Sequence, residues 1–173
     1  PSIVGLRVLP GLDRPFRALV DATADYGHAC CEQTAAKLLS ACAMYALADT
    51  PHRRDRAEAI IVAGVERETS MWLRGRGFKM YPESSPHPDT YWGPKAARYL
   101  YNLALLADRR PSRALGAAID EGLSMARDAA AAYRIEWPPR RPASCEDAYA
   151  AIRFGGGVGE GLSAVRRLTA AAR

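Results

Sequence analysis

Apolar residues recur along most of this chain at the three- and four-residue spacing that places them on one face of a helix. The clearest run follows Cys31 and predicts a helix that ends before Pro51, with Ala35, Leu38, Leu39, Cys42, Tyr45 and Ala46 on its buried face. A second helix is predicted over residues 55–73, with Ala57, Ile60, Ile61, Gly64 and Trp72 on its inner side. Further helices are predicted from the Asp13 cap to a break at residues 26–28, from Pro94 through Ala104, and over residues 112–135, 144–154 and 158–172.

Two stretches depart from the helical pattern. Residues 1–11 predict a short extended lead-in that ends at Pro10 and Gly11. Residues 74–92, "RGRGFKMYPESSPHPDTYW", predict a long aromatic and proline-rich loop, and loops of this length are usually functional or specifically packed. We expect the aromatic residues in and beside this loop to be buried, as core packing or as a shield against water: Trp72, Tyr81, Tyr91 and Trp92.

Composition supports an all-α fold. The chain has 173 residues and is 49% hydrophobic, which fits one domain over residues 1–173 with a real core. Alanine dominates the apolar residues while β-branched and aromatic residues are sparse, a balance that favours helices over strands. Short turns between the predicted helices indicate antiparallel helical hairpins.

Charge excludes some partners. Lys and Arg number 24 against 19 Asp and Glu, a formal net charge of +5, but no basic stripe interleaved with aromatic residues marks a nucleic-acid interface. No apolar run approaches the ~20 residues of a membrane span. The chain starts without Met or a signal peptide, so we expect it to lie inside a longer parent chain.

The segment "HACCEQT" carries the candidate chemistry. With Cys30 at the start of a helix, Gln33 lies three residues on, where i and i+3 side chains meet. Free N–H groups at a helix start favour a thiolate, which can attack the Gln33 carboxamide, expel ammonia and leave an internal thioester. The competing interpretation is that Cys30 is a small buried hydrophobic residue.

Other site chemistries find less support. His28, Cys30 and Cys31 are ligand types for a metal, but a fourth ligand is not evident nearby and no CxxC pair occurs, so no metal or cofactor is predicted. His87 in "SSPHPDTYW" is a candidate general base, although a His between prolines on a loop is more often exposed or packed. The glycine cluster "FGGGVGEG" lacks the Lys-Ser/Thr of a phosphate loop and predicts a turn between helices.

The segment "ACCEQTAAKLL" resembles the Gly-Cys-x-Glu-Gln-Thr motif of the thioester domains of alpha-2-macroglobulins and complement proteins, with Cys30, Glu32, Gln33 and Thr34 at the matching positions. The flank "VLPGLDRPFRALVDATADYGH" is similar to the family's strand, proline and helix before the motif, and "GFKMYP" followed by "DTYWGPKAARYLYNL" resembles its glycine-aromatic loop and next helix. The resemblance covers residues 1–108, with 12–108 the family-like helical part and 109–173 divergent, and it is closest to bacterial members.

This resemblance implies a partial or divergent α/α toroid within a secreted, periplasmic or envelope-associated bacterial protease inhibitor. Cys30 would be the leaving thiolate and Gln33 the acyl donor of a covalent trap for amines on target proteases, with Glu32, Cys31 and His87 as supporting residues. Such a trap is used once and is not an enzyme.

The chain departs from the family pattern at several points. Ala29 stands where the family has Gly, Cys31 adds a second thiol that can compete for Gln33 or form a disulfide, and fewer helices are predicted than a full toroid needs. No histidine follows residue 108, where complement-type domains carry their catalytic His, so we expect amines to be preferred over hydroxyl groups as acceptors. The alternative function is a non-covalent helical interaction domain that has lost the thioester; an α/α toroid enzyme is weaker because its acidic clusters are missing.

Overall fold

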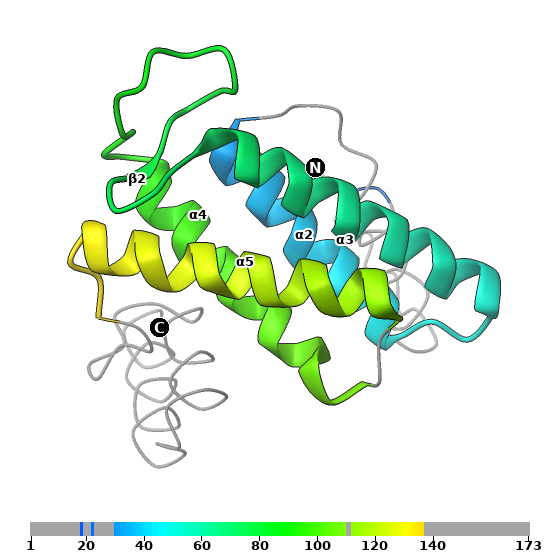
Figure 1. Cartoon of the computed structure of the whole chain (residues 1–173). Coiled ribbons are helices and arrows are strands. Elements are labelled where there is room, and N and C mark those ends of the chain that lie inside the picture. Colours follow the sequence, from blue (N-terminus) through cyan, green and yellow to red (C-terminus); the bar gives the residue numbers. More distant parts are fainter. Residues whose placement is uncertain (1–17, 19–21, 23–29, 110–111, 137–173) are drawn as a thin grey trace, which may run out of the picture. The chain divides into compact units, whose positions relative to one another are not determined.

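The computed structural model describes residues 18, 22, 30–109 and 112–136, and these are mostly helical (Figure 1). Contacts divide the chain into two compact units, Pro1–Ala129 and Ala130–Arg173, and the packing below concerns the first. The described elements are α2 (Cys31–Ala46), α3 (Pro51–Met71), β1 (Trp72–Leu73), β2 (Gly77–Phe78), α4 (Gly93–Leu100), the 3-10 helix η1 (Tyr101–Arg109) and α5 (Arg113–Ala132). The predicted all-α class is confirmed for this part of the chain.

Helix boundaries follow local capping chemistry. The α2 helix begins at Cys31 as predicted. The α3 helix begins at Pro51 rather than at residue 55, because the Thr50 hydroxyl accepts the Arg53 N–H and proline suits the first helical turn. It ends at Met71 rather than at residue 73, because Trp72 continues into a short strand.

The buried faces of α2 and α3 differ in part from the predicted ones. On α2, Leu39 is only half-buried and Ala46 is exposed. The residues that are buried on α2 are Cys31, Thr34, Ala35, Leu38, Ala41, Cys42, Met44 and Tyr45. On α3, Ile60, Gly64 and Trp72 are half-buried, and the buried residues are Ala57, Ile61, Val65, Glu68 and Met71. The contacted face of α3 thus continues along residues 65, 68 and 71, and it includes a carboxylic acid.

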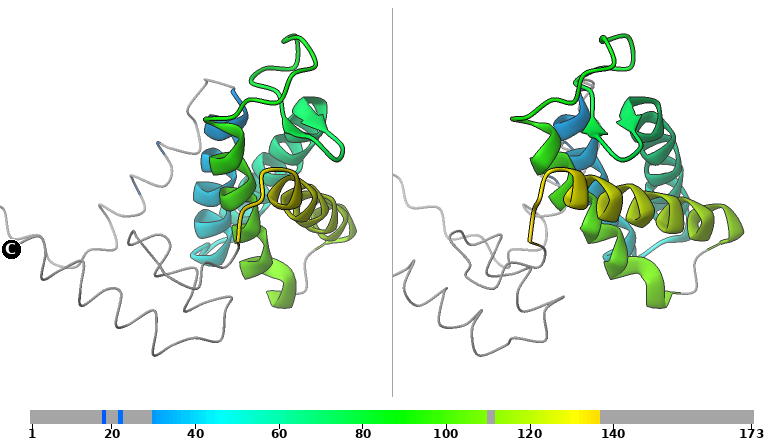
Figure 2. Two further views of the ribbon diagram at one scale, coloured as in Figure 1. Left: turned by 90° about the vertical axis from the view of Figure 1, so that its left-hand side faces the viewer. Right: turned by 60° about the vertical axis from the view of Figure 1, so that its left-hand side comes forward.

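The α2 helix lies between α3 and α4 in the packing of the first unit (Figure 2). Gly64 of α3 allows a close approach to α2, since a Cβ added at Gly64 would lie 2.6 Å from the Leu38 Cδ2 atom. The α5 helix lies across η1 and α3, where Gly122 meets Leu103 and Val65. The α2 helix is therefore held by α3, α4 and η1, and α5 packs on two of these neighbours.

A small hairpin and a loop connect α3 to α4. The strands β1 and β2 pair antiparallel, with Trp72 opposite Phe78 and Leu73 opposite Gly77. The turn between them needs glycine, because Gly75 has a φ of 72°. Asp128 of α5 accepts hydrogen bonds from the Trp72 Nε1–H at 2.7 Å and the Gly75 N–H at 2.8 Å, which fixes the hairpin. The hairpin was not predicted: its first strand was assigned to the preceding helix and its second strand to the loop over residues 74–92.

The expectation that the loop aromatics are buried is wrong for two of the four. Tyr91 is 64% exposed and Tyr81 is also exposed, while Trp72 and Trp92 are half-buried. Several predictions fall outside the described residues: the lead-in over residues 1–11, the glycine cluster, and the helices at 144–154 and 158–172. Of the first helix, predicted over residues 13–26, only Ala18 and Ala22 are described, and both are helical. Among the helices that the structure describes, none is long and apolar enough to cross a membrane.

Candidate functional site

Cys30 and Gln33 face each other at the start of α2. Cys30 is the N-cap residue with extended backbone (φ −73°, ψ 166°), and its thiol accepts the Gln33 N–H at 3.5 Å. In return the Gln33 Oε1 atom accepts the Cys30 N–H at 3.4 Å, which completes a capping box. The helix start therefore links the two residues that are predicted to react through two reciprocal hydrogen bonds.

This geometry follows from the local sequence. A capping box normally pairs a Ser or Thr at the cap with a Glu or Gln three residues later, and here Cys30 takes the place of the hydroxyl residue. Glu32 lies in the first turn, where an acidic side chain interacts favourably with the positive helix end. Cys30 is 5% exposed and Gln33 is half-buried, so the pair is largely withdrawn from solvent.

The loop over residues 79–92 is attached to the start of α2. The Cys31 N–H donates to the Met80 carbonyl oxygen at 3.0 Å, and the Asp89 N–H donates to the Phe78 carbonyl oxygen at 2.7 Å. The Asp89 carboxylate also accepts the Tyr91 N–H at 2.9 Å and the Trp92 N–H at 2.5 Å, which fixes the chain just before α4. The predicted glycine-aromatic loop is thus hydrogen-bonded to the residue next to Cys30.

Cys31 is a poor competitor for Gln33. Its side chain is completely buried, and residues i and i+2 on a helix do not face each other. Burial raises the pKa of the Cys31 thiol, and the nearby acidic groups Glu68, Cys30 and Asp89 raise it further. At neutral pH Cys31 therefore stays a thiol, the weaker nucleophile. Cys30, Cys31 and Cys42 are all free cysteines.

Glu68 is the functional candidate that the sequence analysis missed. Its side chain is 0% exposed, and in the described part of the chain neither carboxyl oxygen has a hydrogen-bond partner. Burial raises its pKa well above the ordinary value of 4.5, although the Arg67 charge and the nearby Ala35 N–H, which does not complete a hydrogen bond to the carboxyl group, act in the opposite direction. Its spacing in the sequence could have revealed it, because Glu68 lies at helical spacing from Ile61 and Val65 on the buried face of α3.

The structure does not bring His87 to the Cys30–Gln33 pair. His87 is exposed on the loop, where its N–H donates to the Ser85 carbonyl oxygen at 2.7 Å. Among the contacts of the described residues, none joins its imidazole to Cys30 or Gln33. Within the same residues no cluster of three His, Cys, Asp or Glu side chains is placed to hold a metal ion, and His28 lies outside them.

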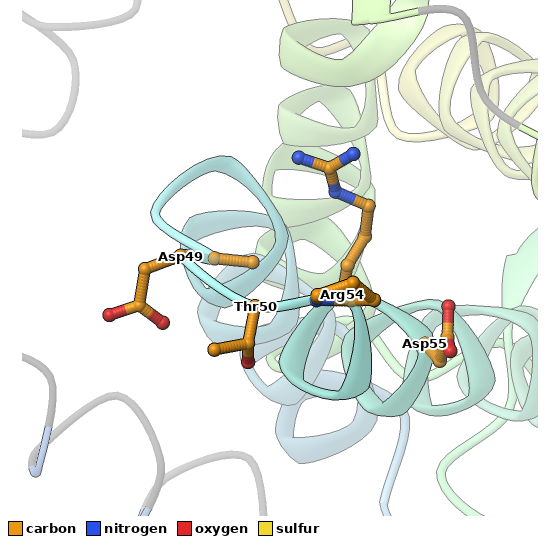
Figure 3. Close-up of a pocket in the computed structure, with 6 residues that line it drawn as sticks. Asp49, Thr50, Arg54 and Asp55 are labelled. Carbon is orange, nitrogen blue, oxygen red and sulfur yellow. The ribbon is translucent and has the colours of Figure 1, made fainter.

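A surface hollow of about 280 Å³ lies at the other end of α2 and is lined by Ala48, Asp49, Thr50, Pro51, Arg54 and Asp55. Figure 3 shows that the labelled side chains of this hollow point away from one another. Arg54 instead lies over the Tyr45 ring, 5.8 Å from its centre. With a rise of ~1.5 Å per residue, the hollow is roughly 20 Å from Cys31. It offers no convergent polar groups and is separate from the reactive pair.

No protein-family model, no curated protein and no solved structure matches this chain. The resemblance of residues 1–108 to thioester domains stays a prediction.

Proposed function

We propose that Cys30 and Gln33 form an internal thioester and that the chain is a thioester domain, with α/α toroid architecture, of a bacterial alpha-2-macroglobulin-like protease inhibitor. The observation that supports this most is the capping box, in which the thiol and the carboxamide each accept a hydrogen bond from the other residue's backbone N–H at the same helix start. The protein would be secreted or held in the periplasm or cell envelope, as part of a longer chain.

Ring closure needs only these two side chains. The Cys30 thiolate attacks the Gln33 carboxamide carbon, the C–N bond breaks, and the amide nitrogen takes up the one proton that the thiol released and leaves as ammonia. The partial positive charge at the start of α2 stabilises the oxyanion that forms on Gln33. The products are one thioester and one ammonia, with no oxidant or cofactor consumed.

In the trapping step the Cys30 sulfur, which was the nucleophile in ring closure, becomes the leaving group. An amine of a target protein attacks the Gln33 acyl carbon, the C–S bond breaks, and the amine proton ends on the Cys30 sulfur. The target is then joined to Gln33 by a stable amide, and no step regenerates the thioester. The domain therefore acts once, with proteases or other amine-bearing proteins as partners, and does not turn over.

Burial of the pair favours this chemistry over simple hydrolysis. Cys30 is 5% exposed, and the loop is attached to the helix start by the hydrogen bond from the Cys31 N–H to the Met80 carbonyl oxygen. Water that cannot reach an acyl group cannot hydrolyse it, which keeps the thioester until a conformational change opens the site. The exposed Tyr81 and Tyr91 take no part in that shielding.

The decisive experiment is the intact mass of freshly purified protein with and without methylamine, followed by peptide mapping across residues 29–34. A thioester makes the chain lighter by one ammonia. After methylamine, the chain becomes heavier than the unreacted sequence by one methylene, with a methylamide on Gln33 and a newly titratable thiol on Cys30.

Three cysteine variants provide matched controls, because all three residues are buried on the same helix. Cys30→Ala must abolish both the ammonia loss and the methylamide, whereas Cys31→Ala and Cys42→Ala must retain them. An unmodified mass with Gln33 intact and Cys30 freely alkylated in the intact parent protein would reject the thioester. Retention of the adduct in Cys30→Ala would assign the chemistry to Cys31 instead.

The exposed Tyr91 and the half-buried Trp92 before α4 favour a second candidate, a non-covalent protein-interaction domain. The rings of Tyr91 and Trp92 meet edge to face with centres 4.6 Å apart, and the Lys95 ammonium lies 4.9 and 4.5 Å from them. Aromatic residues that remain exposed beside a cation are common at protein interfaces. If the mass experiment finds no thioester, this function takes the place of the trap.

A further inference from the structure

Glu68 occupies a place in the core where a carboxylic acid is costly. It lies on the face of α3 that contacts α2, with Ile61, Val65 and Met71 along the same buried series. Both oxygens lack a hydrogen-bond partner among the described residues, and the side chain is fully buried. An orphaned buried carboxyl group loses about 1–3 kcal/mol of hydration without compensation, and an ionised one loses far more. Such a residue calls for a functional explanation.

The groups around Glu68 cannot hold its charge. On α2 it is close to the Cys31 thiol and the Ala35 N–H, and on its own helix it follows Arg67. The same Cys31 thiol is also close to Cys30 and to the Asp89 carboxylate of the loop. Arg67 is exposed, so its charge is largely screened by water. Burial therefore outweighs these groups and favours the neutral form of Glu68.

The position of Glu68 connects this cost to the candidate site. Cys31, its neighbour, follows Cys30 directly and donates its backbone N–H to Met80, the contact that attaches the loop to α2. Any separation of α2 from α3 at Cys31 therefore also strains that hydrogen bond. When Glu68 loses its proton, the buried negative charge raises the free energy of the state in which α2 and α3 are packed together.

We propose that Glu68 is a positioning residue that acts through Cys31: with its proton it keeps the start of α2 and the loop closed over the Cys30–Gln33 pair, and without its proton it opens them to solvent. The inference rests on the proposed function, because the regulated object is access to the thioester. The only chemical step is the transfer of one proton between the Glu68 carboxyl group and water.

The sign and size of the effect follow from proton linkage. The carboxyl group has its ordinary pKa of 4.5 when the site is open and a raised pKa when it is closed. Between these two values opening releases one proton, so the open population increases about tenfold for each pH unit. Below 4.5 both forms are protonated and opening does not depend on pH.

The test measures the alkylation rates of Cys31 and Cys42 in the full chain over a range of pH, each divided by its rate in the chemically unfolded chain at the same pH. This division removes the trivial dependence on the thiolate fraction. Cys42 is equally buried on the same helix, three turns further along, and reports opening of the whole helix. We expect protection of Cys31 to fall with increasing pH by about tenfold per unit relative to Cys42.

Two α3 variants separate the carboxyl group from other causes. Glu68→Gln keeps the shape and cannot ionise, so its ratio of Cys31 to Cys42 protection should be independent of pH. Glu66→Gln removes an exposed acid two residues away on the same helix and should behave as the unmodified chain. Far-ultraviolet circular dichroism confirms that each variant is folded.

The outcomes distinguish this inference from the proposed function. A Cys31 to Cys42 ratio that is independent of pH, or one that changes equally in Glu68→Gln, overturns the role of Glu68 even if methylamine labels Gln33. A ratio that depends on pH and on Glu68, in a chain that shows no ammonia loss, supports the opening while the thioester is rejected.

Discussion

A thiol at the start of α2 occupies the position where helices usually have a hydroxyl or carboxylate oxygen. An oxygen cap stabilises a helix by about 1 kcal/mol, and sulfur is a weaker acceptor. The 3.5 Å distance from the Gln33 nitrogen to the Cys30 sulfur is consistent with a weak cap. Capping strength alone would favour Ser at residue 30, so helix stability does not explain the Cys, whereas the proposed thioester requires it.

Glu68 also makes the stability of the fold depend on pH. Its pKa is raised in the folded chain above 4.5, so the folded state binds more protons than the unfolded state above that pH. Its contribution to stability is thus fully present below 4.5 and is lost as the pH rises through the raised value. At neutral pH we expect Glu68→Met, which has a similar shape and no polar oxygens, to increase the free energy of unfolding by about 1–3 kcal/mol.

Urea unfolding followed by circular dichroism at mildly acidic, neutral and mildly alkaline pH measures this effect. Glu68→Met should gain more over the unmodified chain as the pH rises, whereas the exposed Glu66→Met should show no such trend. A gain that is largest at acidic pH would contradict the assigned direction of the Glu68 pKa shift.

At the scale of elements, the hydrophobic period located α2 and α5 well but not the ends of α3. The reason is that one capping residue decides where each helix starts. Cys30 was recognised as the cap of α2, so its start at Cys31 was predicted, whereas Thr50 was not considered as the cap of α3, which starts at Pro51. The hairpin escaped prediction because two residues per strand carry no period, and it depends on Asp128, which is 56 residues from Trp72. Contacts of that range are not visible in a local pattern.

In the candidate site, too, residues that depend on local sequence were predicted and the residue that depends on tertiary packing was not. Cys30 and Gln33 were predicted because the helix start brings neighbours in sequence together. Glu68 was not, because only the packing of α3 on α2 determines that its carboxyl group is buried. Residue type favours an exposed Glu, and tertiary contact overrides that preference.

Gly64 is expected to control how closely α3 approaches α2. Gly64→Ala gains about 1 kcal/mol of helix propensity, but the new Cβ would lie 2.6 Å from Cδ2 of the buried Leu38, and such overpacking costs about 1–3 kcal/mol. We expect the single variant to be destabilised. In a Leu38→Ala background the obstruction is gone, and the same change should stabilise by about 1 kcal/mol.

Urea unfolding of the four chains of this double-mutant cycle gives the coupling energy directly. Ala63→Gly, at the exposed neighbouring position of α3, calibrates the propensity difference in the same part of the helix. If Gly64→Ala stabilised both backgrounds equally, the conclusion that α2 and α3 approach closely at Gly64 would be wrong.

At the scale of the whole molecule, the proposed trap has to choose among nucleophiles. An unprotonated amine attacks a thioester unaided, whereas a hydroxyl group needs a base to take its proton. The sequence has three histidines, and two of them, His52 and His87, are exposed on the first turn of α3 and on the loop. Neither is placed beside Gln33 in the described part of the chain, so no imidazole there can assist a hydroxyl acceptor.

We therefore expect methylamine to label Gln33 and glycerol at equal concentration to leave it as the thioester or, after hydrolysis, as Glu. Peptide mapping across residues 29–34 in the intact parent protein distinguishes the methylamide, the glycerol ester and the hydrolysed acid by mass. His28→Ala is the informative control, because His28 is two residues from Cys30 in the sequence. Efficient formation of a glycerol ester would contradict the amine preference, and its loss in His28→Ala would identify His28 as the base that makes hydroxyl transfer feasible.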